Sequence, residues 1–265
     1  MAVLNTDENL VLNINKPIGI TSFDVIRQLK KRYPKNKIGH AGTLDPLADG
    51  VLICLVGKTA TAKQDTFMSQ NKDYVYTVLF GIETDTYDIL GKIIESKIYE
   101  PGDIENKVSD IIPNLQGSFE QDTPPFSAAK IDGKPLYRWY LDGKFDEIKD
   151  RAPKRNIKID NHVVMDLEVL SKEDLSNRVF DLLNAVDGGF RQKEIIAGWQ
   201  DFFSATPQQE FLVAKLKATV SKGAYVRGIA KFLGDEFGIG ACTINITRTR
   251  VGDFDIEESI KIEDL

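Results

Sequence analysis

One stretch limits the possible folds of this chain more than any other: a glycine- and proline-rich loop that runs directly into an apolar segment. Residues 39–50 read Gly-His-Ala-Gly-Thr-Leu-Asp-Pro-Leu-Ala-Asp-Gly, and residues 51–56 read Val-Leu-Ile-Cys-Leu-Val. The apolar run predicts a fully buried strand, and a loop held by such a strand is a common place for chemistry. Pro46 pushes Asp45 toward an extended backbone. Loop physics alone leaves two interpretations, a tight turn or a site built around Asp45.

Hydrophobic periodicity along the rest of the chain predicts both strands and helices. Alternating apolar residues predict strands over residues 10–15, 74–80, 211–220 and 241–247. Helical spacing or capping residues predict helices over residues 22–31, 59–69, 103–112, 136–141 and 224–237. We therefore expect an α+β fold: a mixed, mostly antiparallel sheet core with flanking helices packed on one face, and a central cleft.

One segment between two predicted strands stands apart from this pattern. Ser171 begins a capping signal, apolar residues then follow at helical spacing, and the glycine pair at 188–189 separates them from a second predicted helix over residues 190–203. The pattern predicts a helical insertion over residues 171–205, and additional packing is its simplest role. We expect residues 1–265 to form a single catalytic domain with two subdomains.

Composition excludes several classes of protein. No apolar run approaches the ~20 residues that a membrane span needs, and the first residues lack a secretory-signal pattern. Cys54 and Cys242 lie in apolar surroundings without metal-ligand spacing, as expected of core thiols in a reducing compartment. These features predict a cytoplasmic protein that binds neither a membrane nor a metal.

The formal net charge of −6 argues against a general polyanion binder. Basic residues nevertheless gather near the loop and near other distinctive segments, and acidic residues crowd elsewhere. The basic residues concerned are Lys16, Lys72, Lys130, Lys134, Arg138, Lys222, Arg227, Arg248 and Arg250. They predict a basic face on an acidic body, with ordinary solvated charge as the alternative.

The loop around Asp45 resembles the catalytic motif of TruB-type pseudouridine synthases, which isomerise the position-55 uridine in the TΨC loop of tRNA. Further segments resemble motifs of that family in the same order along the chain. They are residues 15–19 (Asn-Lys-Pro-Ile-Gly), 72–74 (Lys-Asp-Tyr), 84–91, 123–137 and 220–227 (Val-Ser-Lys-Gly-Ala-Tyr-Val-Arg). The resemblance implies a pseudouridine synthase-like fold and a reaction that needs no cofactor, because the base stays in its pocket throughout.

The resemblance also implies a role for each matched residue. Asp45 corresponds to the nucleophile, Arg227 to the arginine that holds it bidentately, and Tyr74 to the ring that stacks on the flipped base. Contacts with the substrate or with the uridine pocket are implied for His40, Tyr225, Ile246, Lys16, Lys130 and Lys222. Lys16 is also expected to brace the catalytic loop. The second histidine, His162, matches no motif, and we expect it to have no role in catalysis.

The chain departs from the family pattern in three places. The segment 171–205 is longer than expected, Ala224 replaces the usual threonine, and little chain follows Arg250. We therefore expect no C-terminal RNA-binding (PUA-type) domain, and binding to tRNA that is weaker and less sensitive to salt. Extra packing is favoured over RNA contact for the insertion.

The predicted function is formation of pseudouridine at position 55 by a monomer that binds the T-arm of tRNA. Two alternatives remain: the same chemistry on another T-loop-like or guide-directed RNA, and a non-catalytic tRNA-folding module. A phosphate-binding loop is discarded, because residues 50–52 open a strand and not a helix.

Overall fold

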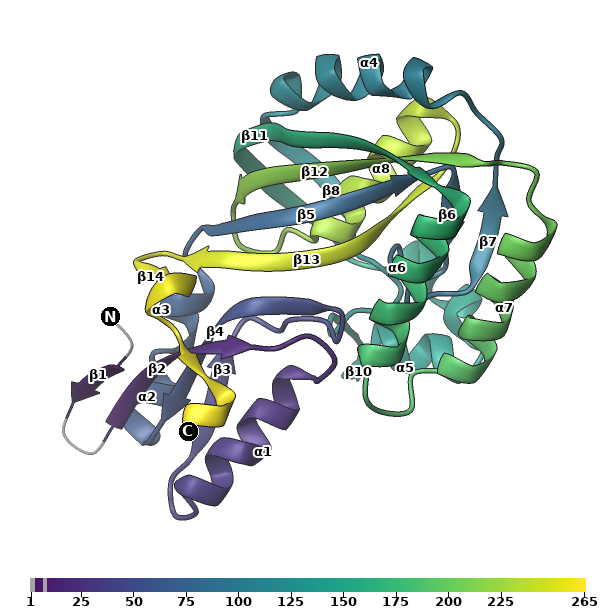
Figure 1. Ribbon diagram of the computed structural model, residues 1–265. Helices are drawn as coiled ribbons and strands as arrows, with labels where there is room; N and C mark the ends of the chain where they lie inside the picture. The colour runs from purple at the N-terminus through teal and green to yellow at the C-terminus, as the bar shows by residue number, and fades with distance from the viewer. Residues whose placement is uncertain (1–2, 7–8) are drawn as a thin grey trace.

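Most strands of the chain assemble into one long, twisted sheet (Figure 1). The structure is a computed structural model that describes residues 3–6 and 9–265. Along the main path of the sheet the order is β1 (Val3–Thr6), β2 (Asn9–Lys16), β4 (Ala48–Val56), β13 (Ala241–Val251), β5 (Lys72–Phe80), β12 (Glu210–Val220), β11 (Lys154–Ser171) and β8 (Gly117–Asp122). Three short strands pair with strands of this path: β3 (Ile38–Ala41) with β4, β14 (Phe254–Asp255) with β13, and β15 (Ile260–Lys261) with β2.

Two small hairpins lie outside the main sheet. One pairs β6 (Ile82–Thr84) with β7 (Ile93–Ser96), and the other pairs β9 (Lys130–Ile131) with β10 (Lys134–Pro135). Within the described strands, the pairs β4–β13 and β2–β15 are parallel and the other pairings are antiparallel. The prediction of a mixed, mostly antiparallel sheet core is therefore confirmed.

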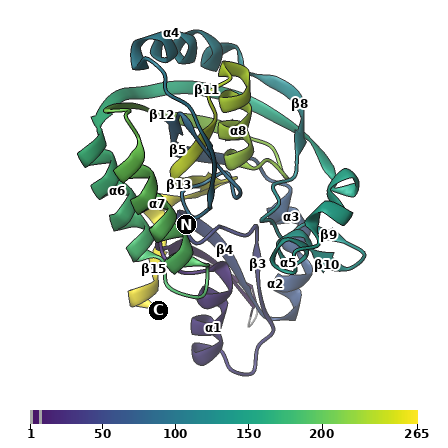
Figure 2. The same cartoon turned by 90° about the vertical axis from the view of Figure 1, so that its right-hand side faces the viewer.

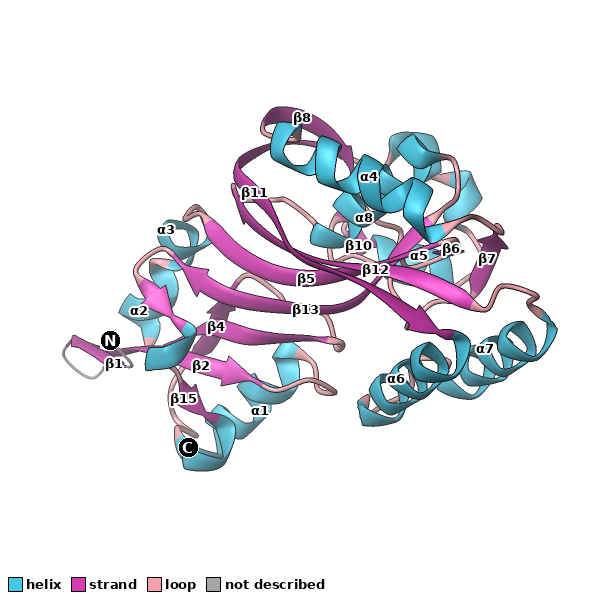
Figure 3. Cartoon of the chain, turned by 45° about the horizontal axis from the view of Figure 1, so that its top comes forward, coloured by secondary structure: helices cyan, strands magenta, loops and turns pink. Residues whose placement is uncertain are grey.

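The helices lie around the sheet along its whole length (Figure 3). They are α1 (Ser22–Arg32), α2 (Lys58–Ala62), α3 (Gln64–Met68), α4 (Pro101–Ile111), α5 (Leu136–Leu141), α6 (Lys172–Ala185), α7 (Gln192–Ala205) and α8 (Val226–Phe237). The single helix predicted over residues 59–69 is instead the two short helices α2 and α3. Within the described part of the chain, no helix combines the length and the apolar character that crossing a bilayer requires.

Helices cover both faces of the sheet, so the expectation of helices on one face is wrong. Ile104 of α4 and Leu233 of α8 pack with Tyr76 and Val78 in one hydrophobic core. On the opposite face, α6 and α7 pack against Leu79 and the neighbouring strands in a second core. Figure 2 shows α8 and the α6–α7 pair on opposite sides of β5, β12 and β13. The physical reason is that these central strands carry apolar residues on both faces.

The parallel pairing of β4 with β13 joins the N-terminal and C-terminal parts of the sheet. It spans three residue pairs, in which Ala48 to Gly50 face Ile246 to Arg248. Gly50 has φ +98°, and a Cβ atom there would lie 2.3 Å from the carbonyl oxygen of Arg248. Only glycine allows the two backbones to approach this closely. The pairing takes in the last three residues of the predicted loop 39–50, which the structure places in β4, so it fixes the end of that loop.

His162 is buried in the main sheet and forms a hydrogen bond with Tyr76, with 2.6 Å between Nε2 and the hydroxyl oxygen. Burial lowers the pKa of His162 from 6.5 to about 4. Between about pH 6.5 and about pH 4, His162 is therefore protonated in the unfolded chain and neutral in the folded chain. The free energy of unfolding is expected to decrease by up to roughly 3 kcal/mol across this window because of His162 alone.

The measurement is urea unfolding at several pH values for the wild type and for His162→Gln, which cannot take up the proton. The stability of the variant is expected to depend less steeply on pH below 6.5. Parallel curves for the two proteins would show that His162 does not titrate in this window.

Candidate active site

The loop that carries Asp45 lies between β3 and β4 and is held on both sides of the carboxylate. The hydroxyl of Ser22 accepts a hydrogen bond from the N–H of Leu44 (2.8 Å) and donates to its carbonyl (3.1 Å). The carbonyl of Pro46 accepts from the N–H of Gly19 (2.8 Å). The backbone is thus fixed before and after Asp45, while the side chain of Asp45 stays 34% exposed. A fixed but accessible carboxylate can meet an incoming substrate.

Arg227, the second residue of α8, forms an ion pair with Asp45. Its Nε donates to Oδ2 of Asp45 at 2.8 Å, although 182 residues separate the two in sequence. The side chain of Arg227 is only 3% exposed. The predicted pairing is therefore confirmed.

The predicted bidentate geometry of this pair is wrong. The two Nη atoms of Arg227 donate instead to the backbone carbonyls of Thr86 and Phe126. The donor groups of a buried guanidinium need hydrogen-bond partners, and each Nη atom finds one in a carbonyl group outside the loop that carries Asp45. The position of the guanidinium therefore depends on the segments that contain Thr86 and Phe126.

A second carboxylate, that of Asp88, lies on the same guanidinium. Its Oδ2 atom is 3.7 Å from Nε of Arg227. Burial raises the pKa of Asp88 to about 6 even though Arg227 opposes the shift. Burial alone would lower the pKa of Arg227, but the charges of Asp45 and Asp88 outweigh it and raise this pKa. The guanidinium consequently stays charged at neutral pH and is shared between two acids.

Tyr74 is connected to the catalytic loop through a buried arginine. Nη1 of Arg248 lies 3.5 Å from the hydroxyl of Tyr74. Nε of Arg248 donates to the carbonyl of Val51 (2.7 Å), and Nη2 donates to the carbonyl of Gly42 (2.9 Å). Arg248 therefore links the predicted stacking ring to both ends of the loop that contains Asp45.

Lys16 lies inside the protein next to the loop that carries Asp45. Its Nζ donates to the carbonyls of Pro17 (2.9 Å) and Ile20 (2.7 Å). Burial lowers the pKa of Lys16 to about 8, and the charges of Asp45 and Asp49 partly oppose that shift. An ammonium group engaged in this way braces the backbone, so of the two roles predicted for Lys16 the structure fits bracing and not direct contact with substrate.

Three further predicted residues lie around the same site. Burial and the nearby charge of Arg248 lower the pKa of His40, so its ring is neutral at neutral pH. Tyr225 precedes α8, and its backbone N–H and carbonyl are both held by the side chain of Gln121. Ile246 is buried in β13, where β13 pairs with β4. Their contacts with substrate stay predictions.

Lys130 and Lys222 are exposed, and in the described part of the chain neither of them pairs with Asp45 or Arg227. Both are free to meet solvent or a phosphate group. The predicted basic face is wrong for four of its nine members, because the structure buries Lys16, Lys72, Arg227 and Arg248. Their charges act inside the protein, around the loop that carries Asp45.

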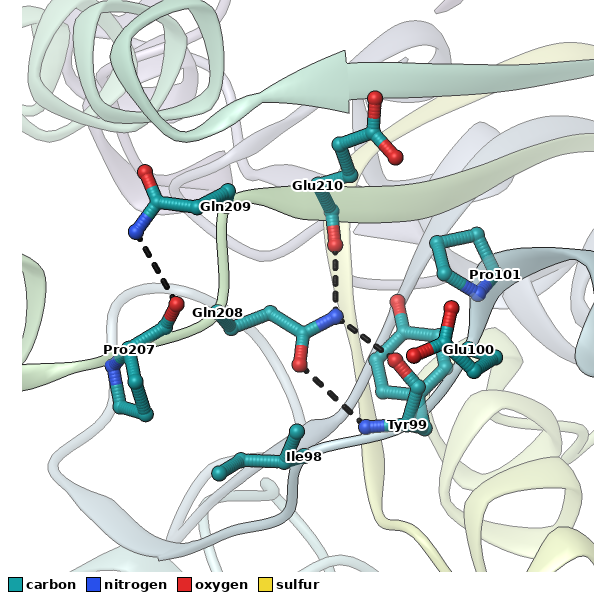
Figure 4. A pocket seen from close by; sticks show the side chains of 8 residues that line it. All are labelled: Ile98, Tyr99, Glu100, Pro101, Pro207, Gln208, Gln209 and Glu210. Atoms are coloured by element: carbon teal, nitrogen blue, oxygen red, sulfur yellow. Dashed lines mark hydrogen bonds between the residues drawn. The ribbon is translucent and has the colours of Figure 1, made fainter.

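A surface hollow elsewhere on the molecule is not a candidate for this chemistry (Figure 4). It is lined by residues 98–101 and 207–210. The side-chain amide of Gln208 crosses it and binds the backbone of Tyr99 and Glu210. Among the described lining residues the charged ones are glutamates, which repel phosphate. The hollow lies between two connecting segments, and among its described lining residues the only ionisable ones are two glutamates and Tyr99.

Comparison with solved structures assigns the fold. A chain of a Cbf5-Nop10-Gar1 complex matches with a TM-score of 0.55 and 22% identity, over 96% of this chain and 53% of that chain. A chain of an H/ACA RNP bound to a substrate RNA containing 2′-deoxyuridine matches with a TM-score of 0.52 and 21% identity, over 96% and 51%. This chain spans about half the length of those solved chains. These solved chains and this chain share one fold.

Sequence comparison then identifies the family. The family model described as TruB family pseudouridylate synthase (N terminal domain) matches residues 30–177. The curated protein named tRNA pseudouridine synthase B from Borreliella burgdorferi (strain ZS7) is 36% identical over 97% of this chain and 75% of its own length. The protein of the same name from Aquifex aeolicus (strain VF5) is 35% identical over 96% of this chain and 72% of its own length. The chain belongs to the TruB family of pseudouridylate synthases.

Proposed function

We propose that this protein converts a uridine of tRNA into pseudouridine, and that its target is position 55 in the T-arm. Membership of the TruB family supports the formation of pseudouridine, and the relatives named tRNA pseudouridine synthase B support tRNA as the substrate. We further propose that it acts as a cytoplasmic monomer, and that residues 1–265 form one catalytic domain with two subdomains. The observation that carries the proposal is the Asp45–Arg227 ion pair, in which Nε and Oδ2 are 2.8 Å apart.

The reaction requires one bond to break and another to form on the same base. The bond between N1 of uracil and C1′ of the ribose breaks, a bond between C5 and C1′ forms, C5 loses a proton, and N1 gains one. No atom enters or leaves overall, so a single nucleophile can carry the reaction. In our proposal Asp45 is that nucleophile, whether it attacks C1′ or C6.

The surroundings of Asp45 suit this task. The buried guanidinium of Arg227 places a positive charge directly against the carboxylate, and Arg248 holds the loop on the side of Tyr74. In our proposal the ring of Tyr74 stacks on the extruded base, an interaction worth about 1–3 kcal/mol. Extrusion itself costs a few kcal/mol, and it costs least for a base in a loop.

The test uses two unmodified tRNA transcripts, one with uridine and one with cytidine at position 55, and maps pseudouridine after incubation with the protein. We expect pseudouridine at position 55 of the uridine transcript and no product from the cytidine transcript. Modification at another uridine would favour a different T-loop-like RNA as substrate. Tight binding of both transcripts without product would favour a non-catalytic tRNA-folding module.

A further inference from the structure

The loop that joins α6 to α7 reaches the candidate site through Arg191. The guanidinium of Arg191 binds both carboxylate oxygens of Asp85, at 2.8 and 3.2 Å. It also lies 4.5 Å from the centre of the Phe126 ring and 5.8 Å from that of Tyr140, whose hydroxyl donates to Asp85. Arg191 has φ +62°, which is uncommon for a residue other than glycine. Such a backbone persists where surrounding contacts determine it.

The partners of Arg191 belong to the two segments that hold Arg227. Asp85 directly precedes Thr86, whose carbonyl accepts from Nη1 of Arg227. Phe126 is stacked under Arg191, and its own carbonyl accepts from Nη2 of Arg227 at 3.0 Å. Arg191 therefore joins the two backbone segments that fix the buried guanidinium.

The same loop also reaches the other member of the ion pair. The N–H of Asp187 donates to the carbonyl of Gly19 (2.9 Å), and the N–H of Gly19 donates to the carbonyl of Pro46 (2.8 Å). A Cβ atom on Gly19 would lie 2.1 Å from the carbonyl oxygen of Ala185, so the contact requires glycine. Pro46 is the neighbour of Asp45. Two hydrogen bonds thus connect the hairpin to the catalytic loop.

Apolar packing supports both connections. Leu183 and Val186 of the hairpin share one hydrophobic core with Leu47, two residues beyond Asp45. Trp199 of α7 is fully buried in that core, and its indole N–H donates to the carbonyl of Ile89 at 3.0 Å. Ile89 belongs to the same turn as Thr86 and Asp88. The hairpin is anchored to this turn as well as to the loop.

The charge of the hairpin does not suit contact with phosphate. The helices α6 and α7 carry the basic residues Lys172, Arg178 and Lys193. They carry the acidic residues Glu173, Asp174, Asp181, Glu194 and Asp201. Proteins bind nucleic-acid backbones through an excess of positive charge, and acidic residues are in excess on these helices.

We propose that the α6–α7 hairpin is a brace that fixes the position of Asp45 relative to Arg227, with Arg191 as its positioning residue. The inference rests on the proposed function, because that function defines the pair as catalytic. Arg191 touches neither member of the pair. It acts through Asp85 and Phe126 on the carbonyls that fix Arg227, while Asp187 acts through Gly19 on the loop of Asp45.

The test compares Arg191→Ala and Arg191→Lys with Lys193→Ala, an exposed site two residues further along. For each protein the single-turnover rate constant at saturating tRNA transcript and the Kd for that transcript are measured separately. Both Arg191 variants are expected to lower the rate constant by about 10- to 100-fold, the scale of a small misplacement of reacting groups. The Kd of both Arg191 variants is expected to equal that of the wild type. For Lys193→Ala, both the rate constant and the Kd are expected to equal the wild-type values.

An added Asp85→Asn substitution separates positioning from general destabilisation. If Arg191 acts through Asp85, the double variant is no slower than the slower single variant. A raised Kd with an unchanged rate constant would overturn the inference in favour of RNA contact. The rate constant is also measured at temperatures where circular dichroism shows the variants to be fully folded. A wild-type rate under those conditions would overturn the inference, because the loss would then come from unfolding. Turnover by the wild type in the same experiment tests the proposed function independently.

Discussion

Replacing Asp45 by asparagine is expected to lower the single-turnover rate of pseudouridine formation by about 10⁴-fold or more, the scale seen when a catalytic nucleophile is removed. Asparagine preserves the shape of the side chain but supplies no carboxylate for covalent attack. Arg227 keeps its bonds to the carbonyls of Thr86 and Phe126 in this variant. The variant is therefore expected to fold and to bind tRNA with little change in Kd.

The measurement is the rate of pseudouridine formation with enzyme in excess, with Kd determined by filter binding. Asp65→Asn is the matched control, because Asp65 is an exposed carboxylate in α3, outside the ion pair. Its rate is expected to equal that of the wild type. An Asp45→Asn protein that retained a tenth of the wild-type rate would contradict the assignment of Asp45 as the nucleophile.

Arg227→Ala is expected to have the second largest effect, on both catalysis and stability. The rate of pseudouridine formation is expected to decrease by about 10²- to 10³-fold, as when a preorganised electrostatic partner is removed. The free energy of unfolding is expected to decrease by about 3–5 kcal/mol, because the buried carboxylate of Asp88 loses its counter-charge. Arg227→Lys keeps the charge, but one ammonium group cannot reach all three hydrogen-bond acceptors of the guanidinium, which are Asp45 and the carbonyls of Thr86 and Phe126.

These variants are compared by single-turnover kinetics, tRNA binding and urea unfolding. Lys231→Ala is the control, because Lys231 lies one turn further along α8 and pairs with Glu83 and Asp235, outside the site. We expect both Arg227 variants to lose far more rate than affinity for tRNA. Equal losses of rate and affinity would show that Arg227 binds RNA and does not serve Asp45.

The longest strand of the sheet, β11, was missed, because most of its side chains are exposed and leave no regular apolar pattern. Four other strands could be predicted from their period of two, and β4 from its continuous apolar run. The face covered by each helix could not. The apolar stripe of a helix shows that it packs on something, but not on which side of a sheet it lies. Leu79, Val213 and Ile244 face α6 and α7, and only the assembled sheet shows that they form a second buried surface.

The central pair of the site could be predicted because the resemblance covers the segments around both Asp45 and Arg227. The segments 84–91 and 123–137 were matched to family motifs, but their exact contacts with the pair could not be predicted. Ser22, Arg248 and the carbonyls of Thr86 and Phe126 all make hydrogen bonds that involve backbone groups, which leave no residue pattern. One signal was present. Arg248 continues the alternation of the buried residues Ile244 and Ile246 in β13, which indicates an arginine that points inward.

The parallel pairing of β4 with β13 has a consequence for biosynthesis. The ribosome makes the strand with Ala48 almost two hundred residues before the strand with Ile246 that lies beside it. Throughout that interval the nascent chain carries an unpaired strand edge, which is prone to aggregate. The sheet can be completed only after the ribosome has made residue 251, the end of β13. A fragment released earlier keeps the unpaired edge of β4 and is expected to be inactive and to aggregate.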